Sequence, residues 1–359
     1  MKKIRIAALA AALSCLLTAC CDYRELNDLA IVRAAAVDAS GAGVRVTAHA
    51  SAGEKAASAT AEGQSAAQAF GRARSAVGPS LYWSHMESLV IGRALVRGGG
   101  LLPLIDVLCR ERELRPSVHL YLAEEDAARL FEDAPEGAID DLSKTFHESR
   151  RGPLLEMRAF ELLNLLAERG ADGCLPVVSI EEEELRLTGV AALSADEIAF
   201  ILDEEQMRTF AVLRAHAEET EFPVSAADTT ATVRVSESAS DIDVRYEAGR
   251  ASFVMRVRLK AVLSELDGAK EPRALLDSAF QAAVEQALSA QLTARADALI
   301  SELKRARSDI LGFGRAFIKK YPAWEEEDLR ALFAGSDIRV EIETDLVGSG
   351  LLITPLRER

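Results

Sequence analysis

The sequence predicts an α+β fold of two or three domains, with mixed or antiparallel sheets and a long helix in the C-terminal domain. Strand and helix patterns follow one another through the first half without regular βαβ alternation. Residues 253–260 place apolar side chains at every odd position and, after Val254, basic side chains at every even position, which is typical of a half-buried antiparallel strand. Residues 272–310 carry apolar side chains at helical spacing, and 359 residues exceed one ordinary domain.

The first half begins with a predicted hairpin, whose strands at 31–37 and 44–50 flank a glycine-containing turn. Residues 53–63 are small and polar, so we expect a loop there. The helix predicted at 153–169 should turn four apolar side chains inward. These four are Leu155, Phe160, Leu163 and Leu166. The other elements expected are helices at 65–77, 124–131 and around 104–108, and strands at 88–91 and 117–122.

The second half shows clearer patterns. The sequence predicts a strand pair at 185–193 and 197–202, a helix at 204–218, a three-strand meander over 231–266 and a final strand at 338–342. Between the last two lies the long helix, whose buried face is predicted by eight apolar residues. They are Leu276, Phe280, Val284, Leu288, Leu292, Leu299, Leu303 and Ile310. We therefore divide the mature chain into an N-terminal α+β region at 20–184, of one or two subdomains, and a C-terminal α+β domain at 185–359.

The first 19 residues have the features of a secretory signal. Lys2, Lys3 and Arg5 precede an apolar run over 6–17, which is shorter than the roughly 20 residues of a membrane-spanning helix. The run ends in Leu-Thr-Ala-Cys at 17–20, which resembles the lipobox of bacterial lipoproteins. In that motif the cysteine is acylated and becomes the first mature residue, so Cys20 is the expected lipidation site. The alternative is an ordinary signal peptide with an incidental cysteine.

Charge and cysteine content narrow the classes of partner. The chain has a net charge of −15, and loss of residues 1–19 removes three basic residues and no acidic one, giving −18. Such an acidic chain argues against binding to nucleic acid or to anionic lipid. The mature cysteines besides Cys20 are Cys21, Cys109 and Cys174. Cys109 and Cys174 could form one disulfide, whereas Cys21 is interpreted as a bystander, an unpaired substitution or a redox partner.

No arrangement of residues predicts catalysis, a metal site or a cofactor site. The five histidines are scattered, and the sequence contains neither a G-x-S-x-G elbow nor a glycine-rich phosphate loop. His85 is interpreted as a partly buried structural histidine in preference to a ligand. Gly312 and Gly314 are assigned to helix termination and close packing. The acidic run at 181–184 and the basic face of the strand at 253–260 are interpreted as solvated. We therefore expect a protein that is not an enzyme.

Four segments carry a resemblance to a known family. Residues 20–28, Cys-Cys-Asp-Tyr-Arg-Glu-Leu-Asn-Asp, are similar to the start of mature Ger(x)C-family spore germination lipoproteins, typically C-W-D-x-R-E-L-N/D. Residues 104–116, 186–213 and 308–355 resemble later parts of that family in the expected order, including its D-x-x-G-F-G motif at 309–314. Cys21 occupies the position of the usual tryptophan.

The resemblance implies the C subunit of a spore germinant receptor. Such a subunit sits on the outer face of the spore inner membrane with membrane subunits A and B, and the complex responds to small germinants. We expect this chain to act there by binding and coupling. The alternative is a solute-binding lipoprotein of a transporter, a class that usually shows two lobes built from βαβ units.

Overall fold

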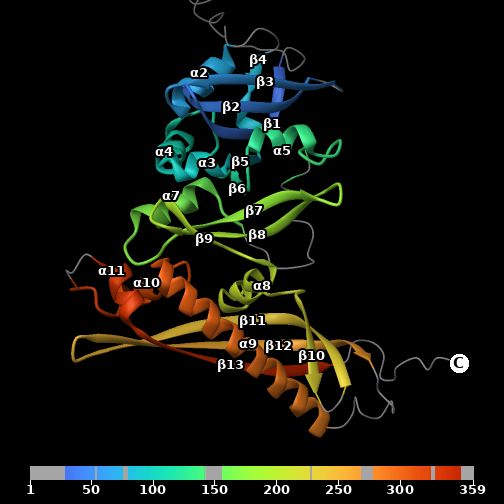
Figure 1. Cartoon of the computed structure of the whole chain (residues 1–359), viewed down its shortest axis with the longest axis vertical. Coiled ribbons are helices and arrows are strands. Elements are labelled where there is room, and N and C mark those ends of the chain that lie inside the picture. The colour runs from blue at the N-terminus through green and yellow to red at the C-terminus, as the bar shows by residue number, and fades with distance from the viewer. Residues whose placement is uncertain are drawn as a thin grey trace, which may run out of the picture.

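A computed structural model describes residues 29–52, 55–75, 80–140, 142, 156–226, 229–267, 278–324 and 328–348. The molecule is elongated, with one large sheet and its helices in the upper half and a second sheet crossed by a long helix in the lower half (Figure 1). This architecture confirms the predicted α+β class. The proposed lipidation site, Cys20, and its neighbour Cys21 lie outside the described residues.

The upper sheet has the strand order β3-β2-β1-β5-β6-β7-β8-β9, with β4 beside the start of β1. The strands β1, β5, β6 and β7 run parallel to one another, and the other pairs along this order are antiparallel. Their bounds are β1 Leu29–Ser40, β2 Gly43–Ala52, β3 Lys55–Gly63, β4 Ser80–Tyr82, β5 Ser88–Gly92, β6 His119–Ala123, β7 Cys174–Glu181, β8 Glu184–Ser194 and β9 Glu197–Leu202. The predicted hairpin at 31–50 is confirmed as β1 and β2.

Helices cover both faces of the central strands, which are therefore apolar throughout. In β5, Leu89 and Ile91 belong to the core that contains the helices α2, α4 and α7, whereas Val90 faces the core of α5. A strand buried on both faces needs this continuous apolar run. The helices of this half are α2 Ala66–Arg74, the 3₁₀ helix η2 Trp83–His85, α3 Arg93–Arg97, α4 Leu101–Arg110, α5 Ala127–Asp133 and α7 Ala159–Ala167.

Three predictions for this half were wrong. Two βαβ crossovers are present, because β5, β6 and β7 are parallel neighbours joined through helices. Residues 55–63 form the edge strand β3. This strand is held by backbone hydrogen bonds to β2, and its small side chains carry no pattern from which a strand could be predicted. The helix α7 is shorter than expected and buries Leu162, while Phe160 remains 37% exposed. Leu163 and Leu166 are partly buried and pack against the core, as predicted, whereas Leu155 lies outside the described residues, so Phe160 is the member of the predicted inward set that the structure contradicts.

The lower sheet has the order β10-β11-β12-β13, with β13 parallel to β12. Its bounds are β10 Glu221–Ala226, β11 Thr229–Glu247, β12 Arg250–Asp267 and β13 Asp337–Gly348. Residues 231–266 therefore form two long strands, and the predicted three-strand meander was wrong. A bulge between Val235 and Glu237 allows β11 to continue past its polar stretch. Ala248 and Gly249, with φ values of 51° and 78°, make the tight turn between the two strands.

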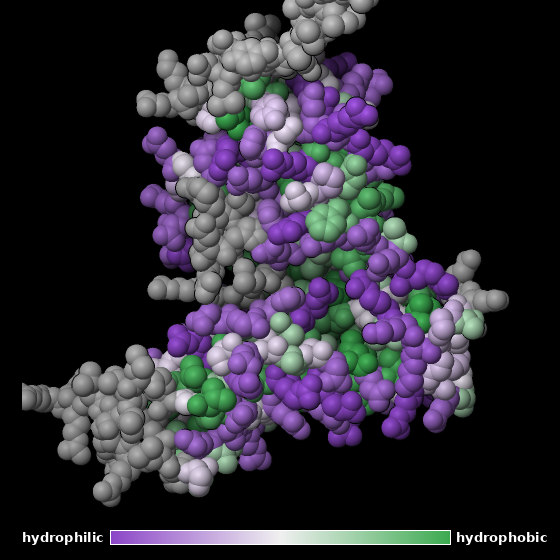
Figure 2. Space-filling view, turned by 180° about the vertical axis from the view of Figure 1, so that it is seen from behind, coloured by the Kyte–Doolittle hydropathy of each residue, from purple (hydrophilic) through white to green (hydrophobic). Residues whose placement is uncertain are grey.

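The helix α9 (Ser278–Ala306) lies across one face of the lower sheet (Figure 1). It buries Val284, Leu288, Leu292, Leu299 and Leu303, as predicted. The helix ends before Arg307, whose φ of 52° leaves the helical conformation, so Ile310 lies beyond it. Two shorter helices, α10 (Phe313–Lys320) and α11 (Leu329–Gly335), follow. Seen from behind, hydrophilic side chains dominate the lower half, while apolar side chains gather at the waist between the halves (Figure 2).

The helix α8 (Glu204–Leu213) connects the two sheets. The predicted domain boundary near residue 185 falls at the start of β8, which pairs with β7 in the upper sheet. The upper sheet is thus continuous across this position, and the passage to the lower sheet comes after β9. The position at which the domains separate stays a prediction.

The packing of α9 makes the first testable prediction. Leu288 is fully buried against the lower sheet, whereas Gln286 is exposed on the same helix. Leu288→Ala should therefore lower the free energy of unfolding by about 2–5 kcal/mol, because it removes apolar contacts and leaves a cavity. Gln286→Ala should change it by no more than about 0.5 kcal/mol. Chemical denaturation of both variants measures the difference, and equal small shifts would contradict the assigned face.

Candidate functional site

A buried carboxylate joins the two halves of the molecule. Asp172 follows α7 in the upper half and is 4% exposed. Arg330 of α11 donates to its Oδ1 from Nη2 at 2.6 Å and from Nε at 2.9 Å. The backbone N–H groups of Ala195 and Asp309 donate to the same carboxylate at 3.0 and 2.8 Å. The hydrogen bond from Arg330 to Asp172 is also the main reason that the pKa of Arg330 is raised. This charge is therefore desolvated but fully paired.

A second buried carboxylate lies directly beside the first. Asp309 follows α9 and receives N–H donors from Gly312, Phe313 and Gly314 at 2.9, 3.0 and 2.7 Å. These donors belong to the start of α10, so the side chain satisfies backbone groups that a helix leaves unpaired at this end. Burial raises the pKa of Asp309 to about 7, the three N–H donors oppose this effect, and nearby Asp172 adds to it.

Two glycines let the backbones of the two halves approach closely. Gly170 has a φ of +86°, and a Cβ atom at this position would lie 2.5 Å from the carbonyl carbon of Gly314. A Cβ atom on Gly314 would lie 2.8 Å from Cα of Gly170. Gly312, with a φ of 81°, precedes α10. The predicted close packing is confirmed at Gly314, whereas the predicted role in helix termination was wrong, because α9 ends at Ala306 and Gly312 precedes the start of α10. We call Gly170, Asp172, Asp309, Gly314 and Arg330 the junction clasp.

Hydrogen bonds from the ends of β8 and α9 extend the junction clasp. The hydroxyl of Ser308 donates to the carbonyl of Leu193, and that of Ser194 donates to the carbonyl of Arg307 at 3.1 Å. The backbone N–H of Asp172 also donates to the carbonyl of Asp309 at 2.9 Å. Residues that lie more than 100 positions apart in the sequence are thus held together by both backbone and side-chain groups. The clasp fixes the upper half against the lower half.

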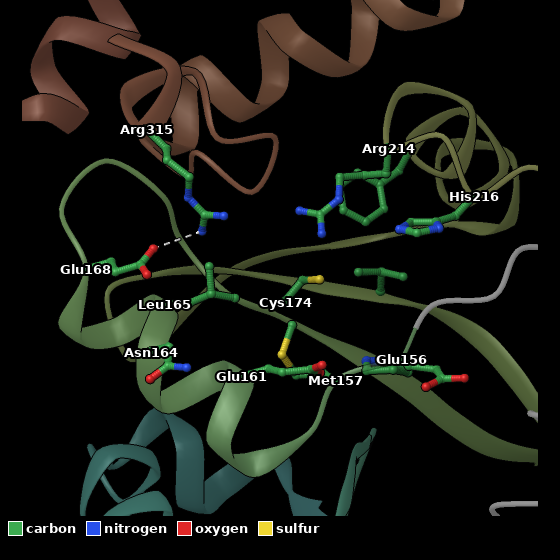
Figure 3. A pocket seen from close by; sticks show the side chains of 13 residues that line it. Glu156, Met157, Glu161, Asn164, Leu165, Glu168, Cys174, Arg214, His216 and Arg315 are labelled. Atoms are coloured by element: carbon green, nitrogen blue, oxygen red, sulfur yellow. Dashed lines mark ion pairs between the residues drawn. The ribbon is translucent and has the colours of Figure 1, made fainter. Parts of the chain in front are cut away.

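A cavity of about 590 Å³ lies beside the clasp, between α7, the strands β7 and β8, and the ends of α8 and α10. Arg214 and Arg315 point into it from one side and the polar residues of α7 line the other (Figure 3). Arg315 pairs with Glu168 at 3.4 Å. Arg214 donates to the carbonyl of Ile310 at 3.0 Å and lies 5.8 Å from the ring centre of Phe210. The cavity therefore carries both charges, with the two arginines facing the glutamates at 156, 161 and 168 over a partly apolar floor.

Both described cysteines are free thiols, so the disulfide considered between Cys109 and Cys174 is not formed. Cys174 lies in the wall of the cavity, and burial raises the pKa of its thiol. Across the described ranges, no group of three or more His, Cys, Asp or Glu side chains is arranged to hold a metal ion.

The other residues singled out in the sequence lie away from the junction. His85 is exposed and packs near Tyr82 with 5.5 Å between ring centres, so its predicted partial burial was wrong. Residues 181–184 are exposed, as predicted. The basic face of β12 is solvated, as expected, and its cations pair with acidic residues of the neighbouring strands. These pairs include Arg256 with Asp241 and Glu341, and Lys260 with Glu237.

Sequence reasoning missed Asp172 and Arg330. Asp172 stands between Gly170 and Gly173 just after an amphipathic helix, and this setting is a local signal for a specialised backbone position. Arg330 has no comparable signal, because one arginine on a short helix resembles any solvated residue. Only folding brings these residues, 158 positions apart in the sequence, into contact.

Comparison with known proteins shows the family to which the chain belongs. The model of the spore germination protein N-terminal domain matches residues 22–180, and the model of the spore germination B3/GerAC-like C-terminal domain matches residues 188–350. The chain belongs to the GerAC-like family of spore germination proteins. Its biological setting is therefore spore germination. The GerAC-like motif at 309–314 forms the central part of the junction clasp.

Two curated proteins of Bacillus subtilis (strain 168) are similar to this GerAC-like chain. Spore germination protein KC is 23% identical, over 96% of this chain and 95% of that protein. The putative spore germination protein YfkR is 23% identical, over 83% of each. The crystal structure of the GerBC protein superposes with a TM-score of 0.61 at 14% identity, covering 87% of this chain and 96% of that one. This likeness shows that the fold is shared. None of the helices in the described ranges combines the length and apolar character that crossing a bilayer requires.

Proposed function

We propose that this GerAC-like protein is the lipid-anchored C subunit of a spore germinant receptor. In this role it binds membrane subunits of A and B type at the outer face of the spore inner membrane and couples them to the germinant response without chemistry. One observation carries the proposal: the family models match both halves of the chain, and the matched motif at 309–314 is the one that locks the halves together.

The junction clasp supports coupling in preference to solute capture. A binding protein that closes on its solute needs lobes that move around a hinge. Here the pair between the buried carboxylate of Asp172 and the partly exposed Arg330, together with a backbone contact between glycines, opposes relative movement of the halves. A force or contact applied to one sheet is then transmitted to the other, which is the property that a coupling subunit requires.

The anchor in this proposal is Cys20. Each buried CH₂ of an acyl chain contributes about 0.8 kcal/mol to membrane binding, and two chains give stable attachment where one is marginal. An anchored subunit stays beside membrane partners at a high local concentration even when its contacts with them are individually weak. The acidic surface of the chain is compatible with this arrangement, because the lipid and not the protein charge supplies membrane affinity.

Replacing Cys20 tests the anchor and the function together. In Cys20→Ala, the precursor should remain uncleaved by the lipoprotein signal peptidase and should take up no radioactive fatty acid, because the acylated sulfur is gone. Spores that carry this variant should respond more slowly to germinants, as followed by the fall in optical density. Cys21→Ala is the matched control and should behave as wild type in all three measurements. Labelling that persists in Cys20→Ala would contradict the assignment.

A further inference from the structure

One long strand of the lower sheet has a free edge. β10 pairs with β11 from Thr229 to Arg234. Just before β10, the N–H of Val235 donates to the carbonyl of Thr220, the N–H of Glu219 donates to the carbonyl of Val235, and the hydroxyl of Ser238 accepts from the N–H of Ala217, where this contact ends. β12 pairs with β11 on its other side as far as Glu247. Among the described residues, no strand therefore pairs with the second half of β11 on the side that faces the upper sheet.

The pairing register identifies the backbone groups on this edge. Glu247 and Arg250 close the two-residue turn, so alternate residues counted back from Glu247 direct their N–H and C=O groups to β12. The residues between them, including Ser240, Ile242, Val244 and Tyr246, direct theirs to the free edge. Lys320 accordingly donates to the carbonyl of Val244, and the N–H of Tyr246 donates to the hydroxyl of Tyr321 at 3.2 Å. In the described part of the chain, the backbone groups of Ser240 and Ile242 have no partner.

A cavity of about 740 Å³ lies over this open stretch. Ser240 and Ile242 line it from β11, Arg214 from the end of α8, and Arg315 and Lys319 from α10. Arg214 and Arg315 also line the cavity beside the clasp, so the two hollows share a wall. The free edge therefore has room beside it for an additional chain.

The cavity is positively charged although the whole chain is acidic, at −15. Arg315 and Lys319 are four positions apart on α10 and so lie on one helical face. The two aspartates in the wall are already paired, Asp241 with Arg256 and Arg258, and Asp243 with Lys320. Within the described residues, neither Arg214 nor Lys319 forms an ion pair. An acidic ligand is thus the complement of this wall.

We propose that an extended acidic segment of a partner protein adds to β11 as a strand over Ser240–Ile242. Main-chain hydrogen bonds to the open edge would supply affinity, and carboxylates at alternate positions would face the cations of α8 and α10. Native sheets usually protect such edges with proline, charge or bulges. β10 carries Pro223, and the bulge of β11 lies at 235–237, so both protections stop short of the open stretch. The inference rests on the proposed role as a subunit of a complex, because it describes how a partner would be held.

A strand-forming peptide tests this proposal. The probe is a fluorescent, end-blocked heptapeptide of sequence Glu-Thr-Glu-Val-Glu-Thr-Glu, titrated by anisotropy into the full acylated protein in detergent. We expect saturable binding that weakens as salt rises. A second peptide with alternate N-methylated amides keeps the charges but cannot form the ladder, and it should bind about tenfold more weakly, a change of about 1.4 kcal/mol.

Two variants separate the edge from its charge. Ile242→Pro removes an N–H that points to the cavity and leaves the bonds to β12, so the sheet should persist while probe binding falls about tenfold. Lys319→Glu should weaken binding about tenfold through like-charge repulsion. Arg110→Glu, at a 78% exposed position on α4, is the charge-matched control and should bind as wild type. Circular dichroism of each variant confirms that it is folded.

Three results would overturn the proposal. They are the absence of saturable binding, equal binding of the N-methylated peptide, and wild-type binding by folded Ile242→Pro. Phosphatidylglycerol vesicles form a separate arm of the experiment. If the protein binds these vesicles but not the peptide, and Lys319→Glu weakens binding to the vesicles, then the cavity recognises lipid headgroups and strand addition is wrong. The labelling and germination of Cys20→Ala do not depend on these results, so the proposed anchor and function can stand when strand addition fails.

Discussion

Arg330→Met should lower the free energy of unfolding by about 2–4 kcal/mol, although it keeps most of the side-chain volume. The loss is smaller than for a fully buried pair, because the Arg330 side chain is 43% exposed. Asp172 is nearly inaccessible to solvent, and Arg330 is the cation that faces its carboxylate at 2.6 Å. Removing this partner leaves a desolvated negative charge in contact with Asp309, whose burial already disfavours ionisation. The variant therefore destabilises the contact between the two halves more than either half alone.

Chemical denaturation and hydrogen exchange can check this expectation. The matched control is Arg339→Met, because Arg339 lies 76% exposed on β13 and forms only a surface pair with Glu341. It should change the free energy of unfolding by no more than about 0.5 kcal/mol. Adding Asp172→Asn to Arg330→Met should recover part of the loss, since the double variant no longer buries an unpaired charge. If Arg330→Met and Arg339→Met shift stability equally, the pair does not hold the junction.

The local sequence pattern was sufficient to predict those strands and helices that bury one face and expose the other. The alternation at 253–260 correctly predicts one buried face of β12, and the spacing of Leu288 and Leu292 correctly predicts the buried face of α9. These predictions hold because each apolar pattern reflects the burial of one face against a single neighbouring layer of the fold. Residues 55–63 lack such a signal, since alanine and serine are compatible with a loop and with an edge strand. Their pairing with β2 decided the outcome.

The junction could not be predicted from local pattern for a different reason. The parallel strands β5 and β6 span only five residues each, and their apolar runs do not reveal strand order. Asp172 and Arg330 come together only after the upper sheet, α8 and the lower sheet have been arranged in space. The D-x-x-G-F-G segment was noticed through resemblance, but its partners were not, because sequence spacing carries no information about contacts between halves. The site is therefore formed only by the arrangement of the strands and helices in space.

Gly170→Ala should be still more destabilising, at about 4 kcal/mol or more. Two effects combine at this position. The φ of +86° is rarely adopted by residues with a side chain, which costs roughly 1–2 kcal/mol. In addition, the new Cβ atom would lie 2.5 Å from the carbonyl carbon of Gly314, so one backbone segment must move. Movement there also strains the hydrogen bond from Gly314 to Asp309, and losses of this size are exceptional for single substitutions.

Two other glycines separate these effects experimentally. Gly249 has a φ of +78° with nothing within 4 Å of an added Cβ, so Gly249→Ala should show the conformational cost alone. Gly71 lies inside α2 with open space, and Gly71→Ala should be neutral or stabilise by about 1 kcal/mol. The difference in unfolding free energy between Gly170→Ala and Gly249→Ala then measures the close approach of the two halves. Were the two variants equally stable, the halves would not be in tight backbone contact, and the clasp could not transmit a signal from one sheet to the other.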